Sequence, residues 1–521
     1  MLSLKKCAQY ILVVLALIAV TTIIVKQLLH KPAISLFPLE HYSQTIATWI
    51  NPADLNYDTP LISADMQKKR QQLFLDHYDG ELSPWSENGI NLVLQKIAPD
   101  DLKTMEINVI KLFSNTKDKP EENIGYGENF RPYSEDWIEK LTNNIDLSPL
   151  DHPNYQENNR AIAIDNLQTR ALPTDDVFLY NFTQAGLGYP FDNLQVSALW
   201  AGTPVYIVME TKDHAWTLIC SPAFIGWVHS NGIARVNAKF VNTWTEAAKK
   251  NLVAITQTET ALLNANEKFL LTSYVGSVFP ASKKTNTDFK LMIPVTDSDH
   301  FAKIETAYVS SQNATLMPMQ LTPHNVATIL STLIGRTYGW GNMYFYNDCS
   351  AELKNLFTPF GIWLPRHSSN QPNAGKMVDM SAASPKERIE FLKKTGQPLL
   401  TIVYIGGHIF LYVGNYPNPH DPSHTLVITY QNVWGLAPKP ANRRAVIGKS
   451  VFFPLLLSYP EDRSLSSLAD KKYFQIGYLN EMPDSSMLTV SGINIETLNH
   501  PGALPKDIAA WQSNPHERKT E

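Results

Sequence analysis

One cysteine lies at the start of a stretch with helical periodicity. Cys349 directly follows Asp348, a residue type that caps helix N-termini. The apolar residues that follow at helical spacing are Leu353, Leu356, Phe357 and Phe360. We therefore expect a helix that begins near Cys349 and ends at Gly361. In its first turn, the helix dipole would lower the pKa of a reactive thiol. The alternative is an inert cysteine on a core helix, since free cysteine is among the most buried residue types.

A thiol nucleophile needs a base, and the base needs a group that orients it. His408 opens an expected strand in which Ile409 to Val413 alternate, and the glycines before it leave room for a close approach. On the next expected strand, Gln431 and Asn432 are amides that can accept the ring N–H of a histidine. Three other histidines compete as bases: His367, His420 and His424. The alternative is that His408 and the amide pair are structural.

Composition excludes several other functions. The 521 residues carry a net charge of −5 without a basic block, so we expect no nucleic-acid partner. The 3 cysteines are far apart, which predicts neither a disulfide framework nor a zinc site. Gly339 and Gly341 lack the third glycine of a dinucleotide-binding loop. We expect no metal and no cofactor.

The N-terminus predicts export. Lys5 and Lys6 precede an apolar run over 10–25, and Lys26 closes it. Residues 1–31 are therefore a signal peptide or a signal anchor. Without an A-x-A cleavage site, we favour an uncleaved anchor in the membrane, with the body of the protein outside the cytoplasm.

The rest of the chain divides into segments that differ in composition and in the spacing of their apolar residues. Residues 32–150 are polar and partly helical, and their aromatic segment 74–85 either packs on a neighbouring domain or forms a docking surface. Short strands broken by turn residues predict a small β-barrel at 160–245 and a second at 250–320. A helix followed by a strand meander predicts an α+β domain at 321–460. Residues 461–521 are expected to form a C-terminal extension.

Several of these motifs together resemble one family, the NlpC-type cell-wall cysteine peptidases. In the catalytic part they are 338–341, 348–350, 360–368, Gln371 and 407–414. The segments at 170–174, 188–195, 202–205, Trp216 and 226–228 look like the bacterial SH3-like domain of a multidomain branch of that family. Segment 74–85 is similar to the N-terminal stabilising segment of the same branch.

The resemblance implies a papain-like fold and cleavage of the γ-D-glutamyl–diamino acid bond of peptidoglycan stem peptides. Carried over by position, Cys349 is the nucleophile and His408 the general base. The family usually has His-Asn-x-Trp-Gly where this chain has Gln431-Asn432-Val433-Trp434-Gly435, so Gln431 takes the third catalytic position. The aromatic stretch 342–346 also departs from the family's smaller loop. The positions that line the substrate pocket in the family are Tyr338, Asp348 and Ser350.

The sequence thus predicts a periplasmic cysteine peptidase, anchored to the inner membrane, that acts on wall peptides. The substitution at Gln431 motivates an alternative: a degenerate peptidase that binds wall peptides or a partner without cutting. A third option is a transferase or amidase, because nucleophiles other than water can intercept the same acyl-enzyme.

Overall fold

The computed structural model describes residues 34–95, 102–182, 184, 188–284, 287–418, 421–439 and 443–483. The predicted anchor at 1–31 lies outside these residues. Within the described ranges, no helix is both long and apolar enough to cross a membrane.

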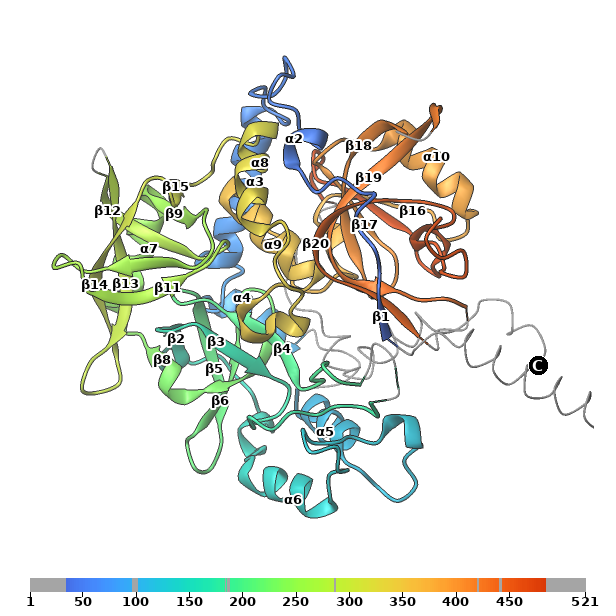
Figure 1. The fold of residues 1–521 in the computed structure, drawn as a ribbon. Coiled ribbons are helices and arrows are strands. Elements are labelled where there is room, and N and C mark those ends of the chain that lie inside the picture. Colours follow the sequence, from blue (N-terminus) through green and yellow to red (C-terminus); the bar gives the residue numbers. More distant parts are fainter. Residues whose placement is uncertain are drawn as a thin grey trace, which may run out of the picture.

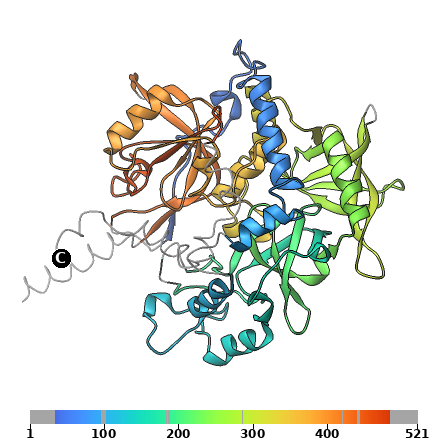
Figure 2. The same cartoon turned by 180° about the vertical axis from the view of Figure 1, so that it is seen from behind.

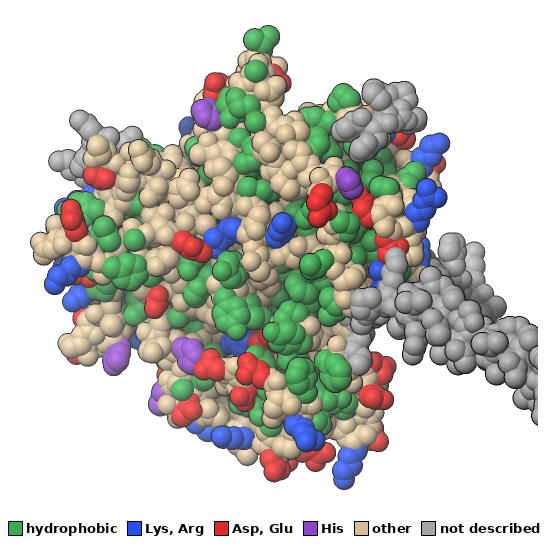
Figure 3. Space-filling view, in the orientation of Figure 1, with side chains coloured by type: hydrophobic (Ala, Val, Ile, Leu, Met, Phe, Trp, Pro, Cys, Tyr) green, Lys and Arg blue, Asp and Glu red, His purple; other side chains and the backbone are tan. Residues whose placement is uncertain are grey.

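Three seven-stranded sheets make up most of the molecule (Figure 1). Two belong to the small barrels and the third to the C-terminal catalytic unit. Helices α3 (Ala64–Tyr78), α8 (Pro323–Leu333) and α9 (Cys349–Phe357) lie between the C-terminal sheet and the second barrel (Figures 1 and 2). On the face shown in Figure 3, acidic and basic side chains are interspersed, and apolar side chains gather where the first barrel meets the C-terminal unit.

The N-terminal segment packs on the rest of the chain. Its helices are α2 (Ile46–Trp49), α3, α4 (Glu87–Gln95), α5 (Leu102–Phe113) and α6 (Glu135–Asn144). Buried Arg70 on α3 donates to the carbonyls of Leu479, at 2.8 Å, and of Ala374. Tyr78 donates to Gly202 O at 2.7 Å, and Trp85 Nε1 to Ala161 O at 2.7 Å. The packing interpretation of segment 74–85 is therefore confirmed.

The first barrel follows. Its strands are β2 (Arg160–Ala163), β3 (Leu167–Arg170), β4 (Gln195–Leu199), β5 (Pro204–Glu210), β6 (Trp216–Cys220), β7 (Ile225–His229) and β8 (Ile233–Arg235), in the order β4-β3-β7-β6-β5-β2-β8. A buried Arg170–Asp192 ion pair closes the long β3–β4 connection, since Asp192 also accepts from the backbone of Phe178. Cys220 is buried on β6.

The second barrel begins after α7 (Ala238–Lys250). Its strands are β9 (Leu252–Ile255), β10 (Thr260–Leu263), β11 (Phe269–Ser273), β12 (Val278–Lys284), β13 (Asp288–Thr296), β14 (Ala302–Ser310) and β15 (Ala314–Leu316). The long β13–β14 hairpin pairs from Asp288↔Ser310 to Thr296↔Ala302.

The catalytic unit is α+β and papain-like. After α8 and α9 come β16 (Lys376–Asp379), α10 (Pro385–Thr395), β17 (Thr401–Tyr404), β18 (Ile409–Asn418), β19 (Asp421–Leu436), β20 (Arg444–Pro454) and β21 (Gln475–Tyr478). The sheet order is β1-β20-β19-β18-β17-β21-β16, and α9 packs against β18 and β19. The apolar face of α9 shares one core with the inward residues of these strands.

Two predicted boundaries of this unit are wrong. β21, from the expected C-terminal extension at 461–521, lies inside the sheet and pairs with both β17 and β16. β1 (Ile34–Leu36), from the expected N-terminal segment, pairs in parallel with β20. Both strands are short, and their partners are far away in the chain, so local periodicity carries no sign of either pairing.

Candidate active site

Cys349 is the first residue of α9. Asp348 is the N-cap, and its Oδ1 accepts the Ala351 N–H at 2.9 Å. The predicted apolar positions Leu353, Leu356 and Phe357 are fully buried. After a short 3-10 turn (Thr358–Phe360), Gly361 ends the segment with φ +72°. The predicted helix, cap and stop are all confirmed.

The thiol is buried in this closed structure, with Cys349 only 6% exposed. Burial raises the pKa of the Cys349 thiol to about 12, and the Asp348 carboxylate adds to the shift. Three groups lower the thiol pKa, but by less: the backbone N–H groups of Ile409 and Ser350 and the guanidinium of Arg366. The expected lowering of the thiol pKa is therefore wrong for this state, because desolvation outweighs the helix N-terminus.

His408 comes just before β18 and is 3% exposed. Because the Ile409 N–H acts on the Cys349 sulfur, the thiol lies beside the start of this strand. His408 Nε2 is 2.7 Å from Gln431 Oε1 on β19. Burial lowers the pKa of His408 to about 4, against the effect of Gln431, so the imidazole is neutral at pH 7. The structure thus brings Cys349, His408 and Gln431 together.

A hydrogen-bond chain fixes how Gln431 is oriented. Thr429 Oγ1 donates to Phe453 O at 2.7 Å, so its lone pairs accept the Gln431 Nε2–H at 2.9 Å. The Gln431 carbonyl oxygen then faces His408 and accepts a hydrogen bond from its Nε2–H. A neutral imidazole protonated at Nε2 carries its basic lone pair on Nδ1. Thr429 is a positioning residue that the sequence did not reveal, because a threonine two residues before an amide is ordinary on a strand.

The neighbouring amide has another role. Asn432 Nδ2 donates to Asn347 O at 2.7 Å, in the loop before the cysteine. Of the two amides singled out in the sequence, Gln431 therefore holds the histidine and Asn432 holds the cysteine loop.

Glu352 is a second residue that sequence reasoning missed. It is fully buried in the first turn of α9 and accepts hydrogen bonds from three elements. The donors are Ser450 Oγ at 2.6 Å, Asn347 Nδ2 at 2.6 Å and the Tyr430 hydroxyl. The only signal in the sequence is an acidic residue three positions after the cysteine, which also suits the helix dipole. Glu352 ties the cysteine helix to β19, β20 and the preceding loop.

Asp348 and Ser350 both contact Arg366. The guanidinium binds both carboxylate oxygens of Asp348, at 3.1 and 2.5 Å, and donates to Ser350 Oγ at 2.7 Å. Arg366 Nε also donates to Ser197 Oγ of β4 at 2.8 Å. Arg366 thus joins the cysteine turn to the first barrel, and the Asp348 carboxylate already has a cationic partner in this state.

Tyr338 lies near Cys349 and Asp348, whose charges add to the effect of burial and raise the pKa of its phenol. Its ring is 6.1 Å from that of Trp434, which meets Phe191 of the first barrel at 5.0 Å. Phe191 also contacts Trp340, with the ring centroids 5.3 Å apart. Aromatic rings from both units therefore form one cluster that extends from Tyr338 to the first barrel.

The aromatic stretch that departs from the family forms a tight turn, η5 (Trp340–Phe345). Asn342 is buried in it and donates to Asn347 Oδ1 at 3.0 Å, while the Phe345 ring meets Trp200 and Tyr274. Most of the stretch thus packs against the barrels, and only Tyr344 is strongly exposed, at 76%.

The competing histidines are placed differently. Burial and Arg366 lower the pKa of His367 to about 4, and within the described residues its side chain makes no hydrogen bond to Cys349. His420 lies outside the described residues, and of His424 only the backbone of β19 is described.

Comparisons with known proteins identify relatives of the chain. A bacterial SH3 domain model (SH3b1 type) matches residues 178–229, within the first barrel. A solved NlpC/P60 endopeptidase from Photobacterium damselae subsp. piscicida is 30% identical, with a TM-score of 0.72, and the match covers 86% of this chain and 99% of that one. An NlpC/P60 family protein from Bacillus cereus is 16% identical, with a TM-score of 0.38, and the match covers 59% of this chain and 98% of that one. No curated protein sequence matches the chain.

Proposed function

Because the chain belongs to the NlpC/P60 family of endopeptidases, we propose that it is a cysteine peptidase that cleaves peptidoglycan stem peptides through Cys349. The observation that carries the proposal is the hydrogen bond of 2.7 Å between His408 and Gln431, beside a thiol at the start of α9. This arrangement supplies a nucleophile in Cys349, a base in His408 and an orienting group in Gln431.

In the proposed mechanism, the Cys349 thiol and the His408 imidazole are both neutral before the reaction starts. His408 Nδ1 takes the thiol proton as the sulfur attacks the scissile carbonyl carbon, which forms a tetrahedral oxyanion. Backbone N–H groups in the first turn of α9 are suited to stabilise that oxyanion. The intermediate collapses, the amine leaves with the proton held by His408, and a thioester remains. His408 then activates water, which releases the acid and restores the thiol.

We propose the γ-D-glutamyl–diamino acid bond as the site of cleavage and Tyr338, Asp348 and Ser350 as substrate contacts. The position of Tyr338 beside Cys349 supports its role. For Asp348, a substrate ammonium would have to share a carboxylate that Arg366 already binds. The first barrel would bound the cleft through Phe191 and favour short peptides. Such substrates place the protein outside the cytoplasm, in the periplasm, and the inner-membrane anchor at 1–31 stays a prediction.

The test is incubation of the full chain with L-Ala-γ-D-Glu-diaminopimelate, followed by mass spectrometry. We expect release of diaminopimelate by the wild type and by Cys220→Ala, the matched control in the first barrel. Cys349→Ala should fold and release none. Undiminished cleavage by Cys349→Ala would overturn the assignment.

A second function, binding of wall peptides without cleavage, is favoured by the raised pKa of the thiol and by Gln431. Iodoacetamide labelling of Cys349, in a background that carries both Cys7→Ala and Cys220→Ala, separates the two functions at neutral pH. A Cys349 that labels faster than a free cysteine in a peptide supports the peptidase. Slower labelling, together with saturable binding of the tripeptide and no product, supports the binder.

A further inference from the structure

A partly open cavity lies at the junction of all four parts of the molecule, and the proposed chemistry does not use it. It has room for about 60 Å³. Phe74 and Tyr78 come from α3, Trp200 and Phe224 from the first barrel, and Val278 from the second. The catalytic unit contributes Trp363 and Lys354. Most of this wall is apolar and aromatic.

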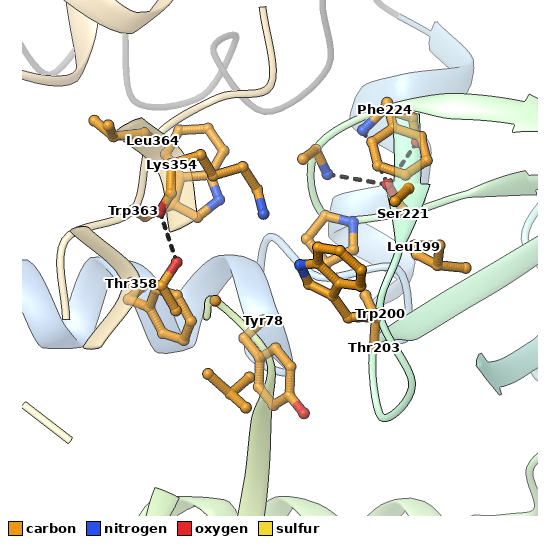
Figure 4. Close-up of a pocket in the computed structure, with 16 residues that line it drawn as sticks. Tyr78, Leu199, Trp200, Thr203, Ser221, Phe224, Lys354, Thr358, Trp363 and Leu364 are labelled. Carbon is orange, nitrogen blue, oxygen red and sulfur yellow. Dashed lines mark hydrogen bonds between the residues drawn. The ribbon is translucent and has the colours of Figure 1, made fainter. Parts of the chain in front are cut away.

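Lys354 is the one charged side chain among the residues that line the cavity. Figure 4 shows it extending into the space that faces Trp200 and the turn from Ser221 to Phe224. In the part of the chain that the structure describes, Nζ has neither a hydrogen-bond nor an ion-pair partner. The charged group that acts on its pKa, after the effect of burial, is another cation, Arg366. Lys354 is only partly exposed, and an ammonium beside an apolar wall is stabilised by a counter-charge.

Three hydroxyl groups of the wall are already engaged. Ser221 Oγ donates to Phe224 O at 2.8 Å and accepts the Phe224 N–H at 2.9 Å. Thr358 donates to Lys354 O at 2.8 Å, and the Tyr78 hydroxyl donates to Gly202 O. Ligand recognition would therefore rest mainly on the one cation and on apolar contact.

These features define one class of ligand. A single ammonium can balance a single negative charge, whereas a multiply charged phosphate would remain underpaired in an apolar wall. The volume suits about four waters, or an organic anion of similar size. We propose that the cavity binds a short-chain monocarboxylate, with its carboxylate on Lys354 Nζ and its alkyl group against the aromatic rings.

The site is distinct from the catalytic centre. Lys354 is five residues after Cys349 on α9 and therefore points about 140° away around the helix axis. Because all four parts of the chain line the cavity, a bound carboxylate would contact each of them and favour the closed arrangement. The inference does not depend on the proposed peptidase activity.

Calorimetric titration of the full chain with sodium propionate tests the proposal, with propionamide as the uncharged isostere. We expect saturable binding of propionate, a rise in melting temperature, and neither effect with propionamide. Lys354→Met should weaken binding by about tenfold or more, because a charge-assisted contact is lost. Lys69→Met, which changes an exposed lysine on α3, is the matched control and should bind as the wild type does.

Three outcomes would overturn the proposal. One is the absence of saturable propionate binding to the folded wild type. Another is propionate binding as tight as that of the wild type in both Lys354→Met and a second uncharged variant, Lys354→Gln. The third is loss of binding in Cys349→Ala, which would place the propionate at the catalytic centre.

Discussion

The polar groups on the two sides of α9 differ in whether they have partners. On the side of the cysteine, Glu352 accepts three hydrogen bonds and Asp348 pairs with Arg366. On the other side, Lys354 faces an aromatic cavity without a partner among the described residues. A saturated network fixes the geometry of a nucleophile, whereas an unpaired charge beside an empty volume is suited to a ligand. One helix thus serves both as a rigid support and as a wall of a cavity.

The largest expected effect follows the loss of Glu352. Glu352→Ala leaves three buried donors without an acceptor, so the free energy of unfolding should fall by about 3 kcal/mol or more. Glu352→Gln keeps one acceptor oxygen and should lose about 1 kcal/mol. Urea unfolding of both variants measures the difference. An alanine variant as stable as the glutamine variant would contradict the role of the network.

A pH effect should come from His408. Its pKa falls from an ordinary 6.5 to about 4 on burial, so the unfolded chain takes up this proton first as the pH decreases. The stabilising contribution is complete above pH 6.5 and is lost toward pH 4, at about 1.4 kcal/mol per pH unit. Urea unfolding between these limits should show a shallower pH dependence for His408→Asn than for the wild type. An equal change of the unfolding free energy with pH in the wild type and in His408→Asn would contradict this role of His408.

Thr429→Val should lower kcat by about tenfold, since the Gln431 amide is then free to turn its nitrogen toward His408. Thr429→Ser keeps the hydroxyl and should restore the rate. In a Gln431→Glu background either carboxylate oxygen can accept, so Thr429→Val should cost much less there. An equal loss in both backgrounds would show that Thr429 acts through packing alone.

The smallest expected effect is a gain in stability rather than a loss. Lys354→Met removes an unpaired cation from an apolar cavity and should stabilise the protein by about 1 kcal/mol in buffer free of carboxylates. Lys69→Met should leave the melting temperature almost unchanged. Destabilisation by Lys354→Met beyond that of the control would mean that the two sides of α9 do not differ as described.

The parts of the site that the sequence predicted are local. Helical spacing after Cys349 and alternation after His408 identify α9 and β18, because each pattern is complete within about a dozen residues. The functions of Glu352, Thr429 and Lys354 depend on partners 24 to 98 residues away, or on a cavity between domains. The direction of the thiol pKa was missed for the same reason, since burial by distant segments decides it.

The pairings of β1 and β21 have a consequence for how the molecule is made. The two barrels are continuous stretches of chain and can fold as each one is completed. The C-terminal sheet needs residues 34–36 at one edge and 475–478 between β17 and β16. Such long loops make its closure slow and late. Cys349 and His408 therefore reach their final arrangement only after almost the whole described chain has been synthesised, so we expect incomplete chains to contain both residues without their final geometry.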